Sequence, residues 1–224
     1  NPQMTATNVT ASMSGCAGQR CMAASAMLAV GNVDTIIDQI CAEAKKVVAG
    51  KNLGAVISKA AKERIENYIS EAEKDGAKIL VDGRNAVVEG KEAGTYVGAT
   101  VIDFVTPEMS VATEEIFGPV ISIMRTANLD EALKIENANP YGNAASVFTQ
   151  SGGAARYVME HASAGMIGVN IGVPVPREPF SFGGWNDSRF GANDITGKSS
   201  IEFWTKLKKT TTKWNAEAGI NWMS

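Results

Sequence analysis

The sequence predicts an α/β fold, a three-layer αβα domain built on a mostly parallel sheet. Segments typical of strands and helices alternate over residues 120–170, in the order strand, helix, strand, helix, strand. That order is typical of parallel strands joined by helical crossovers. With 224 residues, of which 45% are hydrophobic and 20% charged, the chain also has the composition of a globular protein that can bury a core.

The N-terminal third is predicted to be helical. Residues 7–29 are rich in Ala, Ser and Met and are expected to form a helix, or a helix–loop–helix interrupted at Gly18. Residues 33–49 form a second helix, because apolar residues recur there at three- and four-residue steps. A third begins at the cap candidate Ser58 and ends near Gly76. Its predicted buried face holds Ile65, Ile69 and Ala72.

The remaining sequence alternates between short strands and short helices. Residues 173–197 are expected to be irregular because they hold three prolines and several glycines. Lysines and threonines alternate over residues 206–214, which suits a strand protected by charged side chains. Strands are predicted at 78–81, 96–105, 120–125, 144–149 and 166–170, and helices at 129–137, 153–163 and 199–203.

The bulk composition argues against several classes of partner. The net charge is −3, and no cluster of Lys and Arg forms a basic face, so nucleic acid is not expected as a partner. No apolar run approaches the ~20 residues that span a bilayer, and no leader opens the chain, so no membrane is expected. His161 is the single histidine and no Cys–His cluster accompanies it, so no metal site is expected. The three cysteines indicate reduced thiols, and hence a cytoplasmic location, or the mitochondrial matrix in a eukaryote.

Cys21 is the predicted nucleophile, in the run Gly18-Gln19-Arg20-Cys21. The glycine permits a tight backbone path, Arg20 adds a fixed positive charge, and the following residues are expected to begin a helix. Cations and helix-start N–H groups both favour thiolate over thiol. The alternative is a small buried residue beside a helix. Cys41, in contrast, lies in the apolar stripe of a predicted helix and is expected to be structural.

A second group of candidates lies further along the chain. Glu115 and Phe117 precede a Gly-Pro turn, where a carboxylate could bind a ribose diol and an aromatic ring could pack against a nicotinamide; a plain strand-initiating turn would have the same sequence. Asn170 ends a predicted strand, where an Asn is often a turn former. Phe180 and Phe182 precede the pair Gly183-Gly184 and would be suited to packing in the core.

Two blocks resemble the signatures of the aldehyde dehydrogenase superfamily. Gly18-Gln19-Arg20-Cys21 is similar to its thiol motif, and Glu115-Ile116-Phe117-Gly118-Pro119 to its cofactor motif, in the family's order. Arg before and Met after the thiol are similar to the coenzyme A-acylating, methylmalonate-semialdehyde branch. One position departs from the pattern: Ser14 stands where the family usually has an aromatic residue.

The resemblance implies an NAD-dependent oxidation of methylmalonate or malonate semialdehyde to propanoyl- or acetyl-coenzyme A, through a thioester on Cys21. It assigns the substrate carboxylate to Arg20, the nicotinamide ribose to Glu115 and the ring pocket to Phe117. It also implies that Asn170 lies near the active site, as an alternative to a turn former, and that Phe180 and Phe182 line the substrate tunnel, as an alternative to core packing. Residues 1–204 would be the catalytic domain and 205–224 a C-terminal strand and tail that joins subunits of a dimer or tetramer. The dinucleotide-binding domain would lie upstream, outside this chain.

Three alternatives remain open at this point. The first is a hydrolytic aldehyde dehydrogenase of another branch, since the residue that separates water from coenzyme A would precede Asn1. The second is a truncated, inactive fragment that keeps only the fold and the oligomer contacts. The third is a cysteine-dependent hydrolase or acyltransferase that uses no nicotinamide.

Overall fold

The computed structural model describes residues 1–214, and a four-stranded sheet forms its centre. Two strands pair in parallel with the central strand β4, and β2 pairs antiparallel with β3 at one edge. The mostly parallel sheet is therefore confirmed, whereas the antiparallel direction of β2 was not predicted. The strand order is β1 (Ala26–Val30), β4 (Val120–Thr126), β3 (Thr100–Asp103) and β2 (Lys78–Val81).

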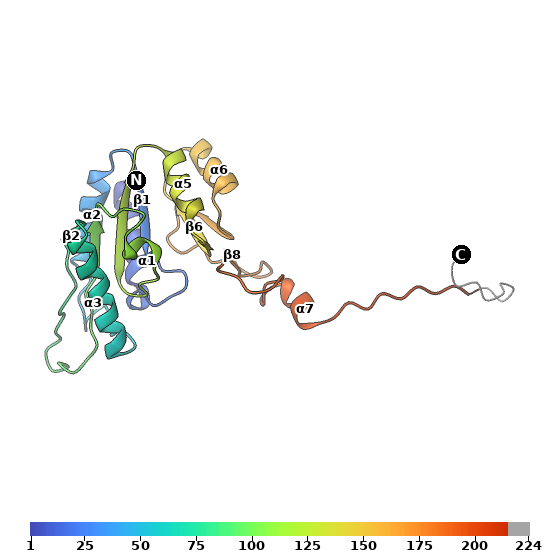
Figure 1. Cartoon of the computed structure of the whole chain (residues 1–224), viewed down its shortest axis with the longest axis horizontal. Coiled ribbons are helices and arrows are strands. Elements are labelled where there is room, and N and C mark those ends of the chain that lie inside the picture. Colours follow the sequence, from blue (N-terminus) through green and yellow to red (C-terminus); the bar gives the residue numbers. More distant parts are fainter. Residues whose placement is uncertain (215–224) are drawn as a thin grey trace.

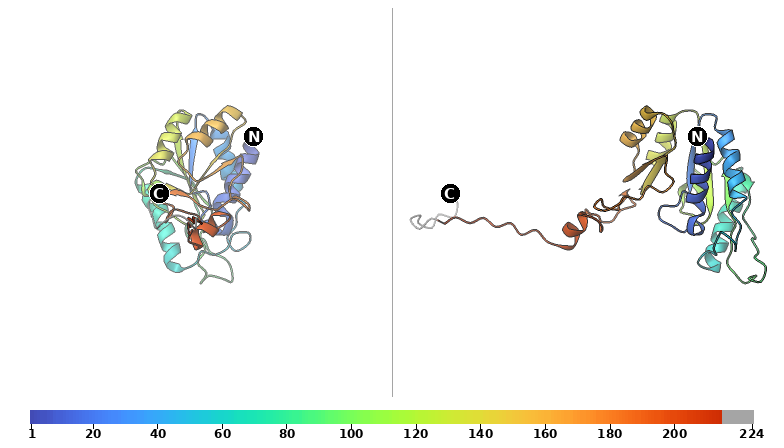
Figure 2. Two further views of the ribbon diagram at one scale, coloured as in Figure 1. Left: turned by 90° about the vertical axis from the view of Figure 1, so that its right-hand side faces the viewer. Right: turned by 180° about the vertical axis from the view of Figure 1, so that it is seen from behind.

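Helices cover both faces of this sheet, which confirms the three-layer arrangement. Along β3, Val101 belongs to the core cluster shared with α1 (Pro2–Ser14) and α2 (Asp34–Ala44). Its neighbour Ile102 belongs to the cluster shared with α3 (Lys59–Lys74). Successive side chains of a strand point to opposite faces, so the two clusters lie on opposite sides of the sheet. The left view of Figure 2 shows α1 and α3 on opposite sides of the strands.

A second, smaller unit follows β4 in the chain (Figure 1). The strands β6 (Ala144–Val147) and β7 (Met166–Val169) pair in parallel and are joined through α6 (Gly152–His161). A small apolar cluster of Leu133, Val158 and Ala162 packs α5 (Leu129–Ala138) and α6 together. The remaining elements are η1 (Gly15–Gly18), α4 (Ser110–Thr113), β5 (Tyr141–Gly142), β8 (Trp185–Asn186) and α7 (Ser199–Trp204).

Most predicted elements are present, with differences at their ends. The third helix follows its local signals: the Ser58 hydroxyl accepts a hydrogen bond from the Ala61 N–H at 3.1 Å, and Gly76 has a φ of +100° after the last turn. The second helix ends at Ala44 rather than at residue 49. The strand predicted over residues 96–105 is ordered as a strand only over 100–103. Residues 7–29 were predicted wrongly in part, because 26–30 form strand β1.

Beyond α7 the chain leaves the body of the molecule (Figure 1). Residues 205–214 are exposed and form no strand with the residues that the structure describes, so the predicted C-terminal strand stays a prediction. Residues 215–224 of the predicted tail lie outside the described residues. Across residues 1–214, no helix combines the length and apolarity needed to cross a membrane.

Candidate active site

Cys21 lies in a turn that leads into a strand. The Ala23 N–H donates to the Arg20 carbonyl at 3.0 Å and closes the turn. The chain then enters β1, because Ser25 and the residues after it pair with β4; the Ser122 N–H donates to the Ser25 carbonyl at 2.9 Å. The expectation that a helix begins after the thiol, and offers it N–H groups, is therefore wrong. The Cys21 side chain is exposed, and within residues 1–214 its N–H donates to no acceptor.

Gly18 and Gly118 bring the two sequence motifs into backbone contact. Gly18 has a φ of +69°, and a Cβ built on it would lie 2.7 Å from the Pro119 nitrogen and closer still to the Gly118 carbonyl. Gly118 in turn lies against α3, since a Cβ there would be 2.7 Å from Cδ1 of Ile65. The segment that carries Cys21 therefore packs directly on the loop that precedes β4, at the amino-terminal ends of β1 and β4.

That loop presents the side chains of Glu115 and Phe117. Arg64 of α3 fixes its backbone, because Nη1 donates to the carbonyls of Glu115 at 3.2 Å and Ile116 at 2.8 Å. Phe117 adopts a φ of +52° and is 37% exposed. The Glu115 carboxylate is exposed and makes no hydrogen bond or ion pair within the described residues. An exposed, unengaged carboxylate beside an exposed aromatic ring fits a ribose diol and a flat ring. Arg64 was missed because it lies 51 residues from the loop.

Arg20 folds back on the segment before the thiol. A Cβ on Gly15 would lie 2.7 Å from the Arg20 Cζ, so a glycine is required there for the guanidinium to occupy this position. The Arg20 Nε is buried without a hydrogen-bond partner, and no carboxylate of residues 1–214 pairs with this side chain. Buried guanidinium groups without an anion are uncommon, because arginine is strongly suited to carboxylates. Arg20 is therefore a cation that lacks a partner beside the exposed thiol.

Asn143 contacts the thiol segment directly, although no local pattern singles it out as a functional residue. Its Nδ2 donates to the Cys21 carbonyl at 2.7 Å and lies 3.4 Å from the Met22 sulfur. Asn143 and Cys21, which share the shorter of these two contacts, are 122 positions apart in the sequence. An Asn directly after a glycine is typical of a turn, so local sequence predicts only a turn former here. Asn143 reaches Cys21 because the smaller unit, with β6 and β7, packs on the unit that holds the main sheet.

The remaining candidates lie around this centre with different contacts. The Asn170 amide accepts from the Thr149 N–H and donates to the Thr149 carbonyl, both at 2.9 Å, so it fastens the ends of β6 and β7. These contacts favour its role as a turn former. Phe180 is 72% exposed and lines an open hollow of about 440 Å³ with residues of β7 and the following loop, and Cys21 is not among the lining residues. Phe182 is half-buried, and its N–H donates to the Thr196 hydroxyl at 2.8 Å.

Cys41 and His161 have structural surroundings. Burial raises the pKa of the Cys41 thiol, against a smaller opposite effect of Lys45, so this sulfur is kept protonated. His161 ends α6, where its Nδ1 lies 2.8 Å from the Tyr157 carbonyl and its ring lies against the Tyr157 ring. Cys21 thus differs from Cys41 in being exposed at the junction of the two motifs.

Known proteins are similar to this chain in sequence and in fold. The family model described as the aldehyde dehydrogenase family matches residues 1–210. The acylating, mitochondrial methylmalonate-semialdehyde/malonate-semialdehyde dehydrogenase of Bos taurus is 42% identical over 223 residues, which cover 97% of this chain and 42% of that protein. The crystal structure of methylmalonate-semialdehyde dehydrogenase from Oceanimonas doudoroffii matches with a TM-score of 0.92 and 38% identity, over 96% of this chain and 46% of that one.

The chain belongs to the aldehyde dehydrogenase family. The resemblance inferred from the two motifs is thereby confirmed, and the similar proteins above carry the names of its methylmalonate-semialdehyde branch. A more distant member, betaine aldehyde dehydrogenase from Staphylococcus aureus in complex with NAD⁺, matches with a TM-score of 0.82 and 27% identity, over 90% of this chain and 41% of that one. The chain spans less than half of the length of each of these proteins.

Proposed function

We propose that this chain is the thiol-bearing part of an NAD-dependent, coenzyme A-acylating aldehyde dehydrogenase that oxidises methylmalonate or malonate semialdehyde. One observation carries the proposal: the exposed Cys21 stands beside Arg20, a cation without a partner, on a segment packed against the Glu115–Phe117 loop. A nucleophile, an anion-binding group and a candidate cofactor loop thus meet at one edge of the sheet. The acylating relative and the NAD-bound family member support the choice of acceptor and cofactor.

Cys21 performs the covalent chemistry in this scheme. Its thiolate adds to the aldehyde carbon, and the oxygen of the resulting thiohemiacetal carries a negative charge. The free Cys21 N–H is a backbone donor available to that oxygen. A bound nicotinamide supplies the hydride acceptor, and Glu115 and Phe117 are the residues that would hold it. Cys21 then keeps the acyl group as a thioester. The carboxylate of that acyl group leaves as carbon dioxide, and a proton from solvent takes its place on carbon. The sulfur of coenzyme A finally attacks the thioester carbonyl, takes the acyl group and gives up its proton, which leaves Cys21 free as the departing thiol.

Arg20 selects substrates that carry a carboxylate. A guanidinium binds a carboxylate through two parallel bonds, whereas an ammonium group binds it as a point charge. A charge-assisted hydrogen bond contributes about 1.5–3 kcal/mol, so Arg20→Lys should lower kcat/KM for malonate semialdehyde by about 10- to 150-fold. The KM for NAD, and the turnover of an uncharged aldehyde such as propanal, should stay within twofold of the parent.

The experiment follows the absorbance of NADH with malonate semialdehyde, with and without coenzyme A. It uses residues 1–224 alone and a longer polypeptide that also carries the family's dinucleotide-binding part. NADH formation that requires coenzyme A and disappears in Cys21→Ala supports the proposal. Turnover without coenzyme A would indicate a hydrolytic enzyme instead. Equal use of malonate semialdehyde by Arg20→Lys and the parent would overturn the role of Arg20.

A homo-oligomer, a dimer or a tetramer, is also part of the proposal. Large apolar side chains near the C-terminal end are strongly exposed in the single chain, as expected of a surface that a second copy covers. Light scattering should show a dimer or larger for residues 1–224 and a monomer for residues 1–198, which lack all of these side chains. We place the protein in the cytoplasm, or in the mitochondrial matrix in a eukaryote, as the name of the Bos taurus relative suggests. The exposed side chains are Ile201, Phe203, Trp204, Leu207 and Trp214.

A further inference from the structure

The thiol stands on a four-residue turn whose central peptide has a partner from another part of the molecule. The bond from the Ala23 N–H to the Arg20 carbonyl closes the turn, and Cys21 and Met22 are its two central residues. In such a turn the peptide between the central residues can take two opposite orientations with the same closing bond, and the flipped one requires a positive φ at the second central residue, here Met22, which does not have one. The carbonyl of this peptide belongs to Cys21, and it accepts the 2.7 Å bond from Asn143 Nδ2.

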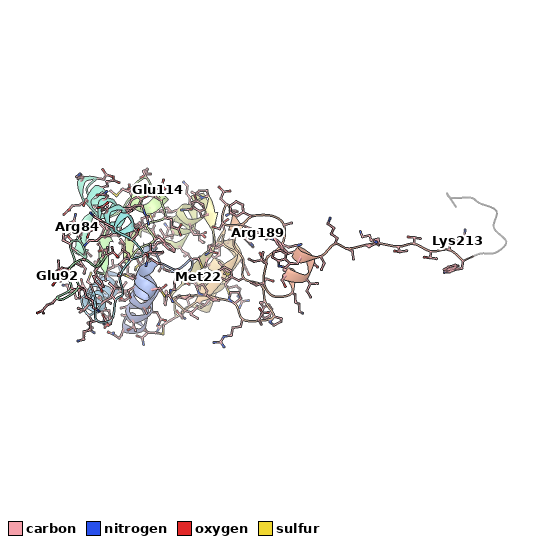
Figure 3. The ribbon with its side chains drawn as sticks, turned by 90° about the horizontal axis from the view of Figure 1, so that it is seen from below. Met22, Arg84, Glu92, Glu114, Arg189 and Lys213 are labelled. Atoms are coloured by element: carbon pink, nitrogen blue, oxygen red, sulfur yellow. The ribbon has the colours of Figure 1, made fainter. Side chains whose placement is uncertain are left out.

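Asn143 is itself held in place. Its backbone lies against the loop before β8, because a Cβ on Gly184 would be 3.0 Å from the Asn143 Cα. The preceding residue is fixed through the Gly142 N–H, which donates to the Ser188 hydroxyl at 3.1 Å. The side-chain nitrogen Nδ2 of Asn143 also lies 3.4 Å from the sulfur of Met22, a side chain that is only 7% exposed. In Figure 3 Met22 lies between the helix α1 and the yellow-to-orange part of the chain that follows β4.

We propose that Asn143 is the positioning residue of the thiol: its amide fixes the central peptide of the turn and so selects the orientation in which Cys21 is presented. The proposal rests on Cys21 being the nucleophile of the proposed function. Both contacts of the Asn143 amide, to the Cys21 carbonyl and to the Met22 sulfur, lie within the turn, so Asn143 acts by orienting Cys21. Because one amide–carbonyl bond shifts an equilibrium by about two- to tenfold, its loss leaves the thiol in the presented orientation for a smaller fraction of the time.

Competitive alkylation measures this fraction without requiring activity. Iodoacetamide is added to residues 1–224, and mass spectrometry of peptides gives the rates at Cys21 and at the exposed Cys16 in the same molecules. Asn143→Leu keeps the approximate size of the side chain and removes the donor. We expect the ratio of the Cys21 rate to the Cys16 rate to fall, by at most about two- to tenfold, because a population changes by less than the equilibrium constant that sets it.

The matched control is Asn137→Leu. Asn137 also donates its amide to a backbone carbonyl, that of His161 at 3.0 Å, but in the α5–α6 region. This variant should leave the ratio unchanged even where it lowers the melting temperature. Asn143→Ala, which removes the donor without placing bulk near Gly184, should show the same loss as Asn143→Leu.

A ratio equal to the parent's in a folded Asn143 variant would overturn the proposal, whatever the change in melting temperature. Failure of the proposed function gives a different result. NADH formation that survives in Cys21→Ala would remove Cys21 from the chemistry, while the alkylation ratios would still report whether Asn143 orients the turn.

Discussion

The contact between Gly18 and Gly118 predicts that a single methyl group at residue 18 separates the two motifs. Gly18→Ala incurs two costs. The φ of +69° places an alanine in the left-handed region, at about 1–2 kcal/mol. The new Cβ would also lie 2.7 Å from the Pro119 nitrogen, well inside van der Waals contact. The atoms that it meets, in Gly118 and Pro119, are all backbone atoms and cannot turn away as a flexible side chain could. Overpacking of this kind costs about 1–3 kcal/mol, so the free energy of unfolding should fall by about 2–5 kcal/mol in all.

Gly31→Ala is the matched control for this prediction. Gly31 has the same φ of +69°, but a Cβ built on it meets nothing within 4 Å. The control therefore carries the backbone cost alone, about 1–2 kcal/mol. Urea unfolding followed by circular dichroism gives both free energies, and Gly18→Ala should be less stable than Gly31→Ala by about 1–3 kcal/mol. Equal stabilities would refute the argument that the two motifs are in close backbone contact.

Three further predictions test other parts of the structure. Arg64→Ala should speed hydrogen exchange of the peptide over residues 114–119, because two carbonyl bonds are lost; Lys59→Ala, an exposed change on the same helix, should not. Asp103→Asn should lower the free energy of unfolding by about 1–3 kcal/mol, because it weakens an ion pair with Arg125 in which the carboxylate is 2% exposed. Asp34→Asn, which changes the exposed partner of the same arginine, should lower it by less than about 1 kcal/mol. Cys41 should be alkylated more slowly than Cys16 and Cys21, because burial raises the pKa of its thiol. Its alkylation rate should also keep rising with pH beyond the range in which an ordinary thiol is fully ionised. Equal rates at all three sulfurs would contradict this prediction.

Elements with strong local signals could be predicted from the sequence. The third helix begins at a serine cap and ends at a glycine with positive φ, and both signals act within a few residues of the helix ends. Strand β1 could not be predicted in this way. Its sequence, Ala-Met-Leu-Ala-Val, is dominated by good helix formers, and it becomes a strand because it pairs along its whole length with β4. Tertiary pairing with residues almost 100 positions away overrides the local preference.

The residues of the candidate site also fall into a group that local sequence predicts and a group that it does not. Cys21, Arg20, Glu115 and Phe117 lie in short motifs, so the type and order of the residues sufficed to select them. The groups that position these motifs come from distant elements, Arg64 from α3 and Asn143 from the segment before β6. Nothing in the local sequence of a surface helix or of a Gly-Asn turn distinguishes them from ordinary polar residues.

The two edges of the main sheet differ in how their charged groups are paired. At the carboxyl ends of β3 and β4, where open α/β sheets commonly bind ligands, Arg125 pairs with Asp103 and Asp34 and lies over the Phe104 ring. The charges at this edge satisfy one another. At the amino-terminal ends of β1 and β4, the Cys21 N–H, the Arg20 Nε and the Glu115 carboxylate have no protein partner within residues 1–214. Of these groups the Arg20 Nε is buried, where an unpaired polar atom is costly, while the exposed Glu115 and Cys21 are accessible to a ligand, so the amino-terminal edge is where we expect substrate and cofactor to bind.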